Sequence, residues 1–401
     1  MGESGEDAPR WQRYLPIATI LVGLLPILLA PLRARELSPD GRGEFAFFQS
    51  AFTIISAAGA LGARHAYYAM RGAGQLDAPV LGKQAAGSSW VASVAVGLPL
   101  VAISWFQHSA ATTALIVLTF AAGPLHLFVQ LQLARAQHDG KVVRVSLTTG
   151  VPALWEFFAN IILFLTHAMT VLTVSIATAA AEVLRGLVSV RRRVRYAGDL
   201  RALRRRYNRQ LWRYAPVGVM PMLVGNVDVI VYGALLPQTQ LGYYAVAKLA
   251  VTLLVFATVV VEGRFLTSDR RFARSAGLTL SLLAITAAVG GIAGTVLVPV
   301  LFGNEYGPAA DIFGVMAGAG FVGGAHVLFT ARAASLQLGA LALSSSTSVF
   351  VVTASAAVTV ASVTQDLRWL ALPIGAGYAV GLAILVTGLL RRPTQQSLEG
   401  V

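Results

Sequence analysis

The stretch RRRVRYAGDLRALRRRYNRQLWR, residues 191–213, divides the chain close to its midpoint. It contains ten arginines and one acidic residue, Asp199, whereas the sequence on either side is strongly apolar. Arginine-rich segments between apolar runs are typical of cytoplasmic loops in membrane proteins. We therefore predict a basic cytoplasmic linker, a hinge loop, at 191–213. It joins an N-terminal lobe, residues 1–190, to a C-terminal lobe, residues 214–401.

The composition of these two lobes is that of an integral membrane protein. Of the 401 residues, 56% are hydrophobic and 12% are charged, and the mean hydropathy is +0.68. Because lipid offers no hydrogen-bond partners, spanning segments must be helices or a closed barrel, and apolar runs without two-residue alternation indicate helices. The predicted fold class is all-α. The chain lacks cysteine, which excludes disulfides and thiol chemistry.

Twelve segments are long enough to span a bilayer, six in each lobe. They cover residues 14–32, 45–63, 88–106, 110–133, 142–165, 169–190, 214–236, 242–261, 276–301, 309–337, 341–363 and 367–390. Lysines and arginines gather on one side if both termini are cytoplasmic, so we predict that orientation. The net charge of +13 is therefore assigned to topology and to anionic membrane lipids, and not to nucleic acid.

The two lobes carry a weak internal repeat. A shift of 200 residues aligns Gly123 with Gly323 and His126 with His326, and one gap brings Gly43 onto Gly242. Since each lobe holds an even number of spans, both lobes enter the membrane in the same direction. This predicts two parallel six-helix repeats with a cavity between them.

Three motifs of the chain match one family of membrane proteins. The first is ARELSPDGRGEFAFFQSAFTIISAAGALGARHAYY, in which the matching residues are Arg35, Leu37, Pro39, Gly43 and Phe45. It resembles the first helix-loop-helix of the Wzx-type oligosaccharide-lipid flippases of the multidrug/oligosaccharidyl-lipid/polysaccharide (MOP) exporter superfamily. Ser38 stands where the family usually has glycine.

The other two motifs lie in the C-terminal lobe. NVDVIVYGALLPQTQLGYYAVAKLA is similar to the family's seventh and eighth helices, and VLFGNEYGPAADIF to a short outer turn between helices nine and ten. The resemblance extends to about Gly339, and the last two helices match only in hydrophobicity. The matching residues of the longer motif are Asp228, Gly242, Tyr244, Ala247 and Lys248.

The resemblance implies transport, not an enzyme. Such a flippase moves undecaprenyl-pyrophosphate-linked oligosaccharide from the cytoplasmic to the outer leaflet of the bacterial inner membrane by alternating access. The transported lipid then serves surface polysaccharide biosynthesis, and neither a cofactor nor a metal is implied. A glycosyltransferase and a polymerase are candidate partners. The basic segment would bind a cytoplasmic glycosyltransferase or, as is commoner for such segments, the lipid surface.

Charged side chains at membrane depth are the first functional candidates. Asp228 and Lys248 are placed to pair across the hairpin of the seventh and eighth spans. They are interpreted either as a cavity pair that substrate or a coupling cation breaks, or as a static ion pair. Glu156 is taken as the only acid deep in the first lobe. It would couple transport to protons or sodium, or its carboxyl would be satisfied by Asn160 one turn away or by a neighbouring helix.

Two residue pairs recur in both lobes. Arg64 and Arg264 lie at equivalent inner ends of spans, where two guanidinium groups are suited to a pyrophosphate, although topology anchors have the same pattern. His126 and His326 lie at matching depths, as packed neutral side chains or as a proton relay.

Arg33 and Arg35 lie where the first span is predicted to leave the membrane. They are candidates for steering a headgroup at the outer mouth. The alternative is ordinary pairing with nearby acids, namely Glu36, Asp40 and Glu44.

Other functions remain open at this point. A lipid II flippase and a cation-coupled multidrug exporter share the expected fold, but the exporters use an acid in helix one and residues 14–32 contain none. A membrane glycosyltransferase or polymerase needs carboxylates on sizeable outer loops, and the predicted outer loops are a few residues long.

Overall fold

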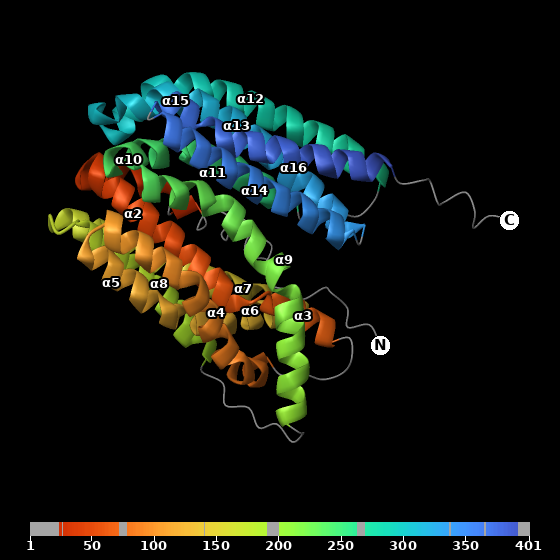
Figure 1. Cartoon of the computed structure of the whole chain (residues 1–401). Helices are drawn as coiled ribbons and strands as arrows, with labels where there is room; N and C mark the ends of the chain where they lie inside the picture. Colours follow the sequence, from red (N-terminus) through yellow and green to blue (C-terminus); the bar gives the residue numbers. More distant parts are fainter. Residues whose placement is uncertain are drawn as a thin grey trace. The chain divides into compact units, whose positions relative to one another are not determined.

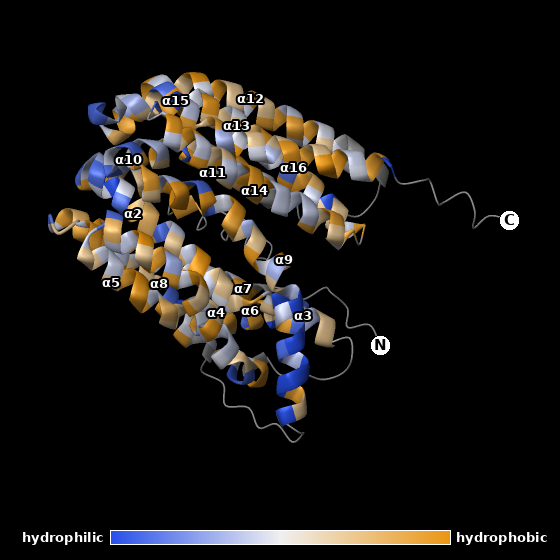
Figure 2. Ribbon diagram, viewed as in Figure 1, coloured by the Kyte–Doolittle hydropathy of each residue, from blue (hydrophilic) through white to orange (hydrophobic). Residues whose placement is uncertain are grey.

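The computed structural model describes residues 24–25, 27–71, 78–139, 141–190, 200–262, 269–336, 338–364 and 366–391. Over these ranges the chain is helical and forms no strand (Figure 1). Within them, ten helices are long and apolar enough to cross a membrane. Apolar residues predominate along these helices (Figure 2), as expected where lipid replaces water. The prediction of an all-α integral membrane protein is confirmed.

The ten helices and the twelve predicted spans differ in two places. The predicted span 14–32 falls mostly outside the described residues. The predicted span 169–190 is present as α8 (Val171–Val190), which carries Glu182 and Arg185 and is not among the ten. The remaining ten predicted spans each coincide with one of the ten apolar helices.

The chain divides into two compact units. Unit 1 comprises Met1–Leu37 and Phe47–Met222, and unit 2 comprises Ser38–Ala46 and Leu223–Val401. The helix α9 (Leu200–Leu235) contributes to both units, so residues 200–213 are the first part of a long helix. A loop was wrongly expected at these residues; the rest of the basic segment, 191–199, lies outside the described residues.

Unit 1 is built mainly from the N-terminal helices, coloured red to yellow in Figure 1. Besides parts of α2 (Ala30–Ala60) and α9, it contains α3 (Ala63–Arg71), α4 (Ala78–Gln107), α5 (Ala110–Leu118), the short 3-10 helix η2 (Thr119–Ala121), α6 (Ala122–His138), α7 (Val142–Leu165) and α8.

Unit 2 contains the remaining helices, coloured green to blue in Figure 1. They are α10 (Gln238–Ala247), α11 (Leu249–Glu262), α12 (Asp269–Phe302), the 3-10 helix η3 (Asn304–Tyr306), α13 (Gly307–Ser335), α14 (Gly339–Val363), α15 (Leu367–Leu370) and α16 (Leu372–Leu390).

Each unit contains the same three-helix arrangement. In unit 1, α6, α7 and α8 pack against one another, and in unit 2, α13, α14 and α16 do the same. The 200-residue shift places α8 on residues 371–390, and α16 occupies nearly the same range. The sequence repeat is therefore a repeat of helices and of their contacts.

The helix α2 bends at Ser38, the residue before Pro39. A residue that precedes proline is disfavoured in the helical region because the proline ring clashes with it. Ser38 has φ 58° and ψ 170°, a conformation that glycine adopts most easily. This bend is where the chain passes from unit 1 to unit 2.

Within unit 2, the segment after the bend lies directly against α10. A Cβ atom on Gly43 would lie 2.1 Å from the carbonyl oxygen of Gln238, and one on Gly242 would lie 1.9 Å from that of Pro39. Backbone approaches this close tolerate only glycine. The two glycines aligned by the repeat therefore face each other's helices, and the contact explains why both lack a side chain.

We predict that Gly242→Ala lowers the free energy of unfolding by about 2 kcal/mol, because its methyl group overlaps backbone that cannot move aside. Gly290→Ala is the control, since nothing lies within 4 Å of a Cβ there. The control should be neutral or stabilising by up to about 1 kcal/mol, as alanine is the better helix former. Thermal unfolding in detergent measures both variants; equal effects would contradict the close contact.

Candidate functional site

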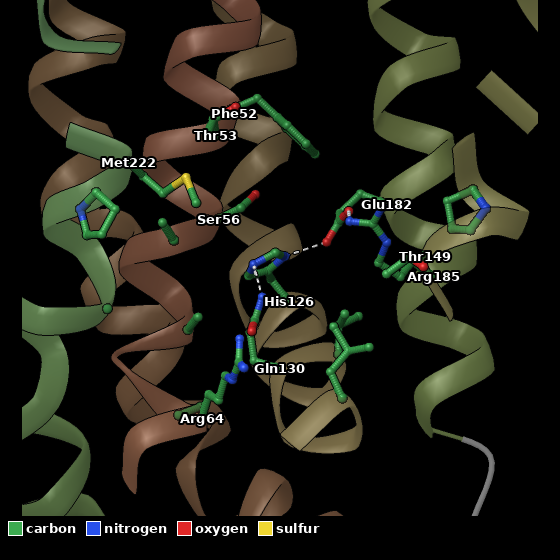
Figure 3. Close-up of a pocket in the computed structure, with 18 of the residues that line it drawn as sticks. Phe52, Thr53, Ser56, Arg64, His126, Gln130, Thr149, Glu182, Arg185 and Met222 are labelled. Atoms are coloured by element: carbon green, nitrogen blue, oxygen red, sulfur yellow. Dashed lines mark hydrogen bonds and ion pairs between the residues drawn. The ribbon is translucent and has the colours of Figure 1, made fainter. Parts of the chain in front are cut away.

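Unit 1 encloses a cavity of about 590 Å³. It lies between α2, α3, α6, α7, α8 and α9, all from the unit 1 side of the chain. Its floor and walls combine apolar groups with charged and hydrogen-bonding side chains (Figure 3). The lining residues that carry this polarity are Arg64, His65, His126, Gln130, Glu156, Thr178, Glu182 and Arg185.

Helical spacing gathers the polar side chains on the faces that border the cavity. His126 and Gln130 are four residues apart on α6, and Glu182 and Arg185 are three apart on α8. Side chains at these spacings lie on one face of a helix. The rest of α8 is largely apolar, whereas α6 carries further polar side chains toward its C-terminal end.

The first charged group is a buried pair between α2 and α7. A terminal nitrogen of Arg33 lies 2.7 Å from Oε1 of Glu156, and Nε of Arg33 donates to Oδ1 of Asn160 at 2.9 Å. The hydroxyl of Thr178 donates to the same oxygen of Glu156 at 3.0 Å. Arg33 is 2% exposed. The buried guanidinium and carboxylate thus neutralise each other.

This geometry bears on the expectations for Arg33 and Glu156. Arg33 was expected to steer a headgroup or to pair with a nearby acid, and it pairs with Glu156, which is 123 residues away. Asn160 accepts a hydrogen bond from Arg33 and does not contact the Glu156 carboxyl, which is satisfied from neighbouring helices by Arg33 and Thr178. A charge with a membrane-buried partner costs far less free energy than an isolated one, which explains why α2 and α7 meet at these residues.

The second charged group is centred on Glu182. Its Oε1 lies 2.5 Å from Nδ1 of His126, and its Oε2 accepts from Arg185 at 2.8 Å. The amide nitrogen of Gln130 lies 3.0 Å from Nε2 of His126 and donates to it. The ring proton is therefore on Nδ1, directed at the carboxylate. Figure 3 shows these side chains in a row along the cavity.

Glu182 was missed at the level of sequence, where Glu156 was taken as the only deep acid of the first lobe. Glu182 is 7% exposed and lines the cavity. Arg185 follows it by one turn, so in sequence the two read as a local helix pair near the end of a span. The useful signal was an acid inside an apolar segment, which holds for Glu182 as well as for Glu156.

Arg64 is a further basic side chain that lines the cavity. It lies on α3 just after the turn at Leu61 and Gly62, both with positive φ, and its side chain is exposed and points into the cavity (Figure 3). Among the described residues, no carboxylate forms an ion pair with it. Arg64 is therefore the guanidinium of this cavity with room for an anionic ligand.

The repeat-equivalent positions in unit 2 are mostly uncharged. The 200-residue shift places His126 on His326 and Arg64 on Arg264, but it replaces five other polar residues by small, aromatic or apolar ones. Gln130, Glu156, Thr178, Glu182 and Arg185 correspond to Thr330, Ala356, Tyr378, Leu382 and Leu385. The cluster around Glu156 and Glu182 is therefore specific to unit 1.

His326 shows the same difference in detail. It is 4% exposed, and its Nε2 lies 2.9 Å from Oγ of Ser345, which itself donates to the carbonyl of Gly381 at 2.8 Å. Since the serine proton is used on Gly381, His326 donates from Nε2 to Oγ of Ser345. This buried, hydrogen-bonded position favours the packed histidine of the two interpretations.

Unit 2 holds one deep ion pair among its described residues, at the positions expected from the sequence. Nζ of Lys248 lies 2.6 Å from Oδ1 of Asp228 and also donates to the carbonyl of Gly225 at 2.7 Å. Tyr244 donates to the other carboxylate oxygen. Asp228 is 0% exposed. With all these contacts satisfied, the geometry favours a static clamp between α9 and α10 over a substrate contact.

Arg35 and Arg264 are the two predicted site residues not yet considered. Arg35 is exposed on α2 and is not among the residues that line the cavity. Arg264 lies outside the described residues, so its expected pairing with Arg64 remains a prediction. Within the described chain, no group of three or more metal-ligating side chains occurs.

The Arg33–Glu156 pair leads to a stability prediction. Arg33→Gln leaves Glu156 unpaired in a buried place and should cost about 3 kcal/mol of unfolding free energy, whereas Arg33→Gln with Glu156→Gln should recover much of the loss. Lys141→Gln is the control, because its pair with Asp139 is exposed and is expected to contribute less than about 1 kcal/mol. Thermal unfolding of these proteins and of Glu156→Gln alone gives the answer; additive effects of the Arg33 and Glu156 substitutions would contradict the pair.

Solved structures with the same arrangement of helices are membrane transporters. "Lipid II flippase MurJ, inward closed conformation" aligns with 96% of this chain and 89% of its own, at 12% identity and a TM-score of 0.72. An inward-facing multidrug resistance MATE family transporter of the MOP superfamily aligns over 94% and 98%, at 12% identity and 0.65.

A third match is the MATE multidrug transporter DinF-BH, which covers 96% of both chains at 15% identity and a TM-score of 0.56. No protein-family model and no curated protein sequence matches this chain. Likeness at these identities is a likeness of fold. The chain is a multi-pass membrane protein with the fold of the MOP superfamily transporters.

Proposed function

We propose that this chain is a flippase that moves a polyprenyl-pyrophosphate-linked oligosaccharide from the cytoplasmic to the outer leaflet of a bacterial inner membrane. The cargo in this proposal is the undecaprenyl-linked precursor of a surface polysaccharide, carried by alternating access with both termini of the chain cytoplasmic. The fold supports transport, and the chemistry of the unit 1 cavity supports an anionic cargo. No covalent bond changes during such a cycle.

The observation that carries the proposal is how the charges of the cavity are distributed. Glu156 is neutralised by Arg33, and Glu182 by Arg185 and by the hydrogen bond from His126. Arg64 has no carboxylate partner among the described residues. An anion entering the cavity therefore meets an uncommitted guanidinium, which binds phosphate oxygens in a bidentate manner.

The size of the cavity fits a headgroup better than a whole glycolipid. About 590 Å³ is within the range of about 300–1,000 Å³ typical of ligand sites. A pyrophosphate with its adjoining sugar is of that order, whereas the polyprenyl chain is apolar and has the lipid around the helices as its solvent. The cavity thus recognises the part of the cargo that cannot cross the membrane unaided.

Lipid II is the alternative cargo, because it carries the same polyprenyl pyrophosphate and one structure of the same fold is titled a lipid II flippase. A cation-coupled drug exporter fits the cavity less well. A lipophilic cation needs an unpaired carboxylate, and both acids that line the cavity already have basic partners. Because Arg33 already pairs with Glu156, a coupling role for Glu156 requires that this ion pair first break.

We predict that Arg64→Gln lowers the rate of lipid-linked oligosaccharide flipping in proteoliposomes at least tenfold. Arg135→Gln, which removes a helix-end arginine paired with Asp139, should stay within twofold of the unsubstituted protein. The measurement is the accessibility of the labelled glycan to an added enzyme on the outer side. Lipid II in parallel vesicles distinguishes the two cargoes. Full activity of Arg64→Gln on both lipids would refute the assignment.

Glu182→Gln should change binding and turnover in opposite directions. Removing this carboxylate frees Arg185 and raises the positive charge of the cavity, so inorganic pyrophosphate should bind several-fold more tightly. Flipping should become slower, because the anion is released less readily. Calorimetric titration and the flipping assay measure the two effects. Glu305→Gln, an exposed acid outside the cavity, should leave both unchanged; weaker binding in Glu182→Gln would contradict this role.

A further inference from the structure

The first fourteen residues of α9, 200–213, form an arm with two contrasting faces. Leu203, Tyr207 and Leu211 recur every four residues and are 7%, 0% and 0% exposed. They belong to the hydrophobic cluster that includes Tyr67 and Met70 of α3. This packing fixes how the arm is rotated about its own axis, and hence which side chains it presents outward.

The opposite face of the arm is a stripe of arginines. Arg201, Arg205, Arg209 and Arg213 also recur every four residues, and all are exposed. Figure 2 shows this end of α9 as strongly hydrophilic. Like charges at this spacing destabilise a helix by about 0.2–0.5 kcal/mol per pair, so the stripe lowers the stability of the arm unless an anionic surface faces it.

The middle of the stripe has no acidic partner among the described residues. Arg205 and Arg209 form no ion pair with a described residue, and Arg213 lies over the ring of Tyr214, with its guanidinium carbon 5.9 Å from the ring centroid. Trp212, between the two ends of the stripe, is 52% exposed. An exposed tryptophan beside arginines at the start of a spanning helix is typical of the membrane interface.

The position of the stripe along α9 indicates its partner. The apolar part of α9 begins at Tyr214, directly after Arg213. At 1.5 Å per residue, Arg209 lies about 6 Å and Arg201 about 18 Å along the helix from Arg213. The headgroup layer on each side of a bilayer is about 5–8 Å thick, and its charge acts over a further 8 Å or so at physiological salt. Arg213 and Arg209, which are nearest to the apolar part of α9, thus lie at the depth of the headgroups.

We propose that the arginine stripe of α9 binds the anionic phospholipid headgroups of the leaflet that borders it. The bound lipids offset the repulsion between the arginines and hold the arm against α3. Gly218 of the same helix contacts Gly62, where an added Cβ would lie 2.6 Å from its Cα, and Gly62 precedes Arg64 by two residues. Anionic lipid therefore stabilises the wall of the cavity that carries Arg64. This surface is distinct from the proposed cargo site and does not depend on flipping.

The test compares stability in two lipid environments. The protein is placed in nanodiscs of phosphatidylcholine alone or of an equal mixture with phosphatidylglycerol, and its melting temperature is measured. The unsubstituted protein should melt several degrees higher with phosphatidylglycerol. Arg205→Gln with Arg209→Gln should lose at least half of that gain, because two stripe contacts are removed while the buried face is untouched.

The matched control is Arg204→Gln with Arg206→Gln, which removes the same charge from the same helix beside the stripe. The control should keep most of the gain. Native mass spectrometry of bound phosphatidylglycerol gives a second readout that does not rely on melting. No gain in the unsubstituted protein, or equal losses in both double variants, would overturn the proposal. Neither measurement involves the cargo, so the proposed flippase function stands or falls separately.

Discussion

A charged side chain that is buried in a membrane needs a partner of opposite charge, and this constraint determines which helices pair in both units. Arg33 meets Glu156 in unit 1, and Lys248 meets Asp228 in unit 2. Each pair, with the hydrogen bonds around it, joins two helices through directional contacts, so these side chains also fix which helix faces meet. The polar residues of this chain therefore specify helix pairing as well as any binding chemistry.

Equivalent helices of the two repeats carry different side chains. In unit 1, α6 and α8 carry His126 and Glu182 toward a cavity, whereas the equivalent α13 and α16 bury His326 among Ser345 and Gly381. Leu382 replaces the carboxylate, and apolar packing replaces the charge cluster. One repeat thus keeps a polar interior that can accept a ligand, and the other acts through packing.

The sequence predicted what depends on local spacing and failed where distant segments meet. Asp228 and Lys248 were predicted to pair because they lie on two helices joined by a short turn. The partner of Arg33 lies 123 residues away, and nothing local indicates it. The arm of α9 was expected to be a loop because the segment 191–213 is dominated by ten arginines. The apolar residues Leu203, Tyr207 and Leu211, which recur every four positions as in a helix, were overlooked. Two expectations, for Arg264 and for the span 14–32, lie wholly or mostly outside the described residues.

The central claim is that the charged cavity of unit 1 receives the pyrophosphate of the cargo. Hydrogen-deuterium exchange of the protein in nanodiscs, with and without a short-chain polyprenyl pyrophosphate oligosaccharide, tests it directly. The account predicts added protection in peptides that line the cavity, around Arg64 on α3 and Glu182 on α8. Protection confined to the peptides around Asp228 and Lys248, with the unit 1 cavity unchanged, would contradict it.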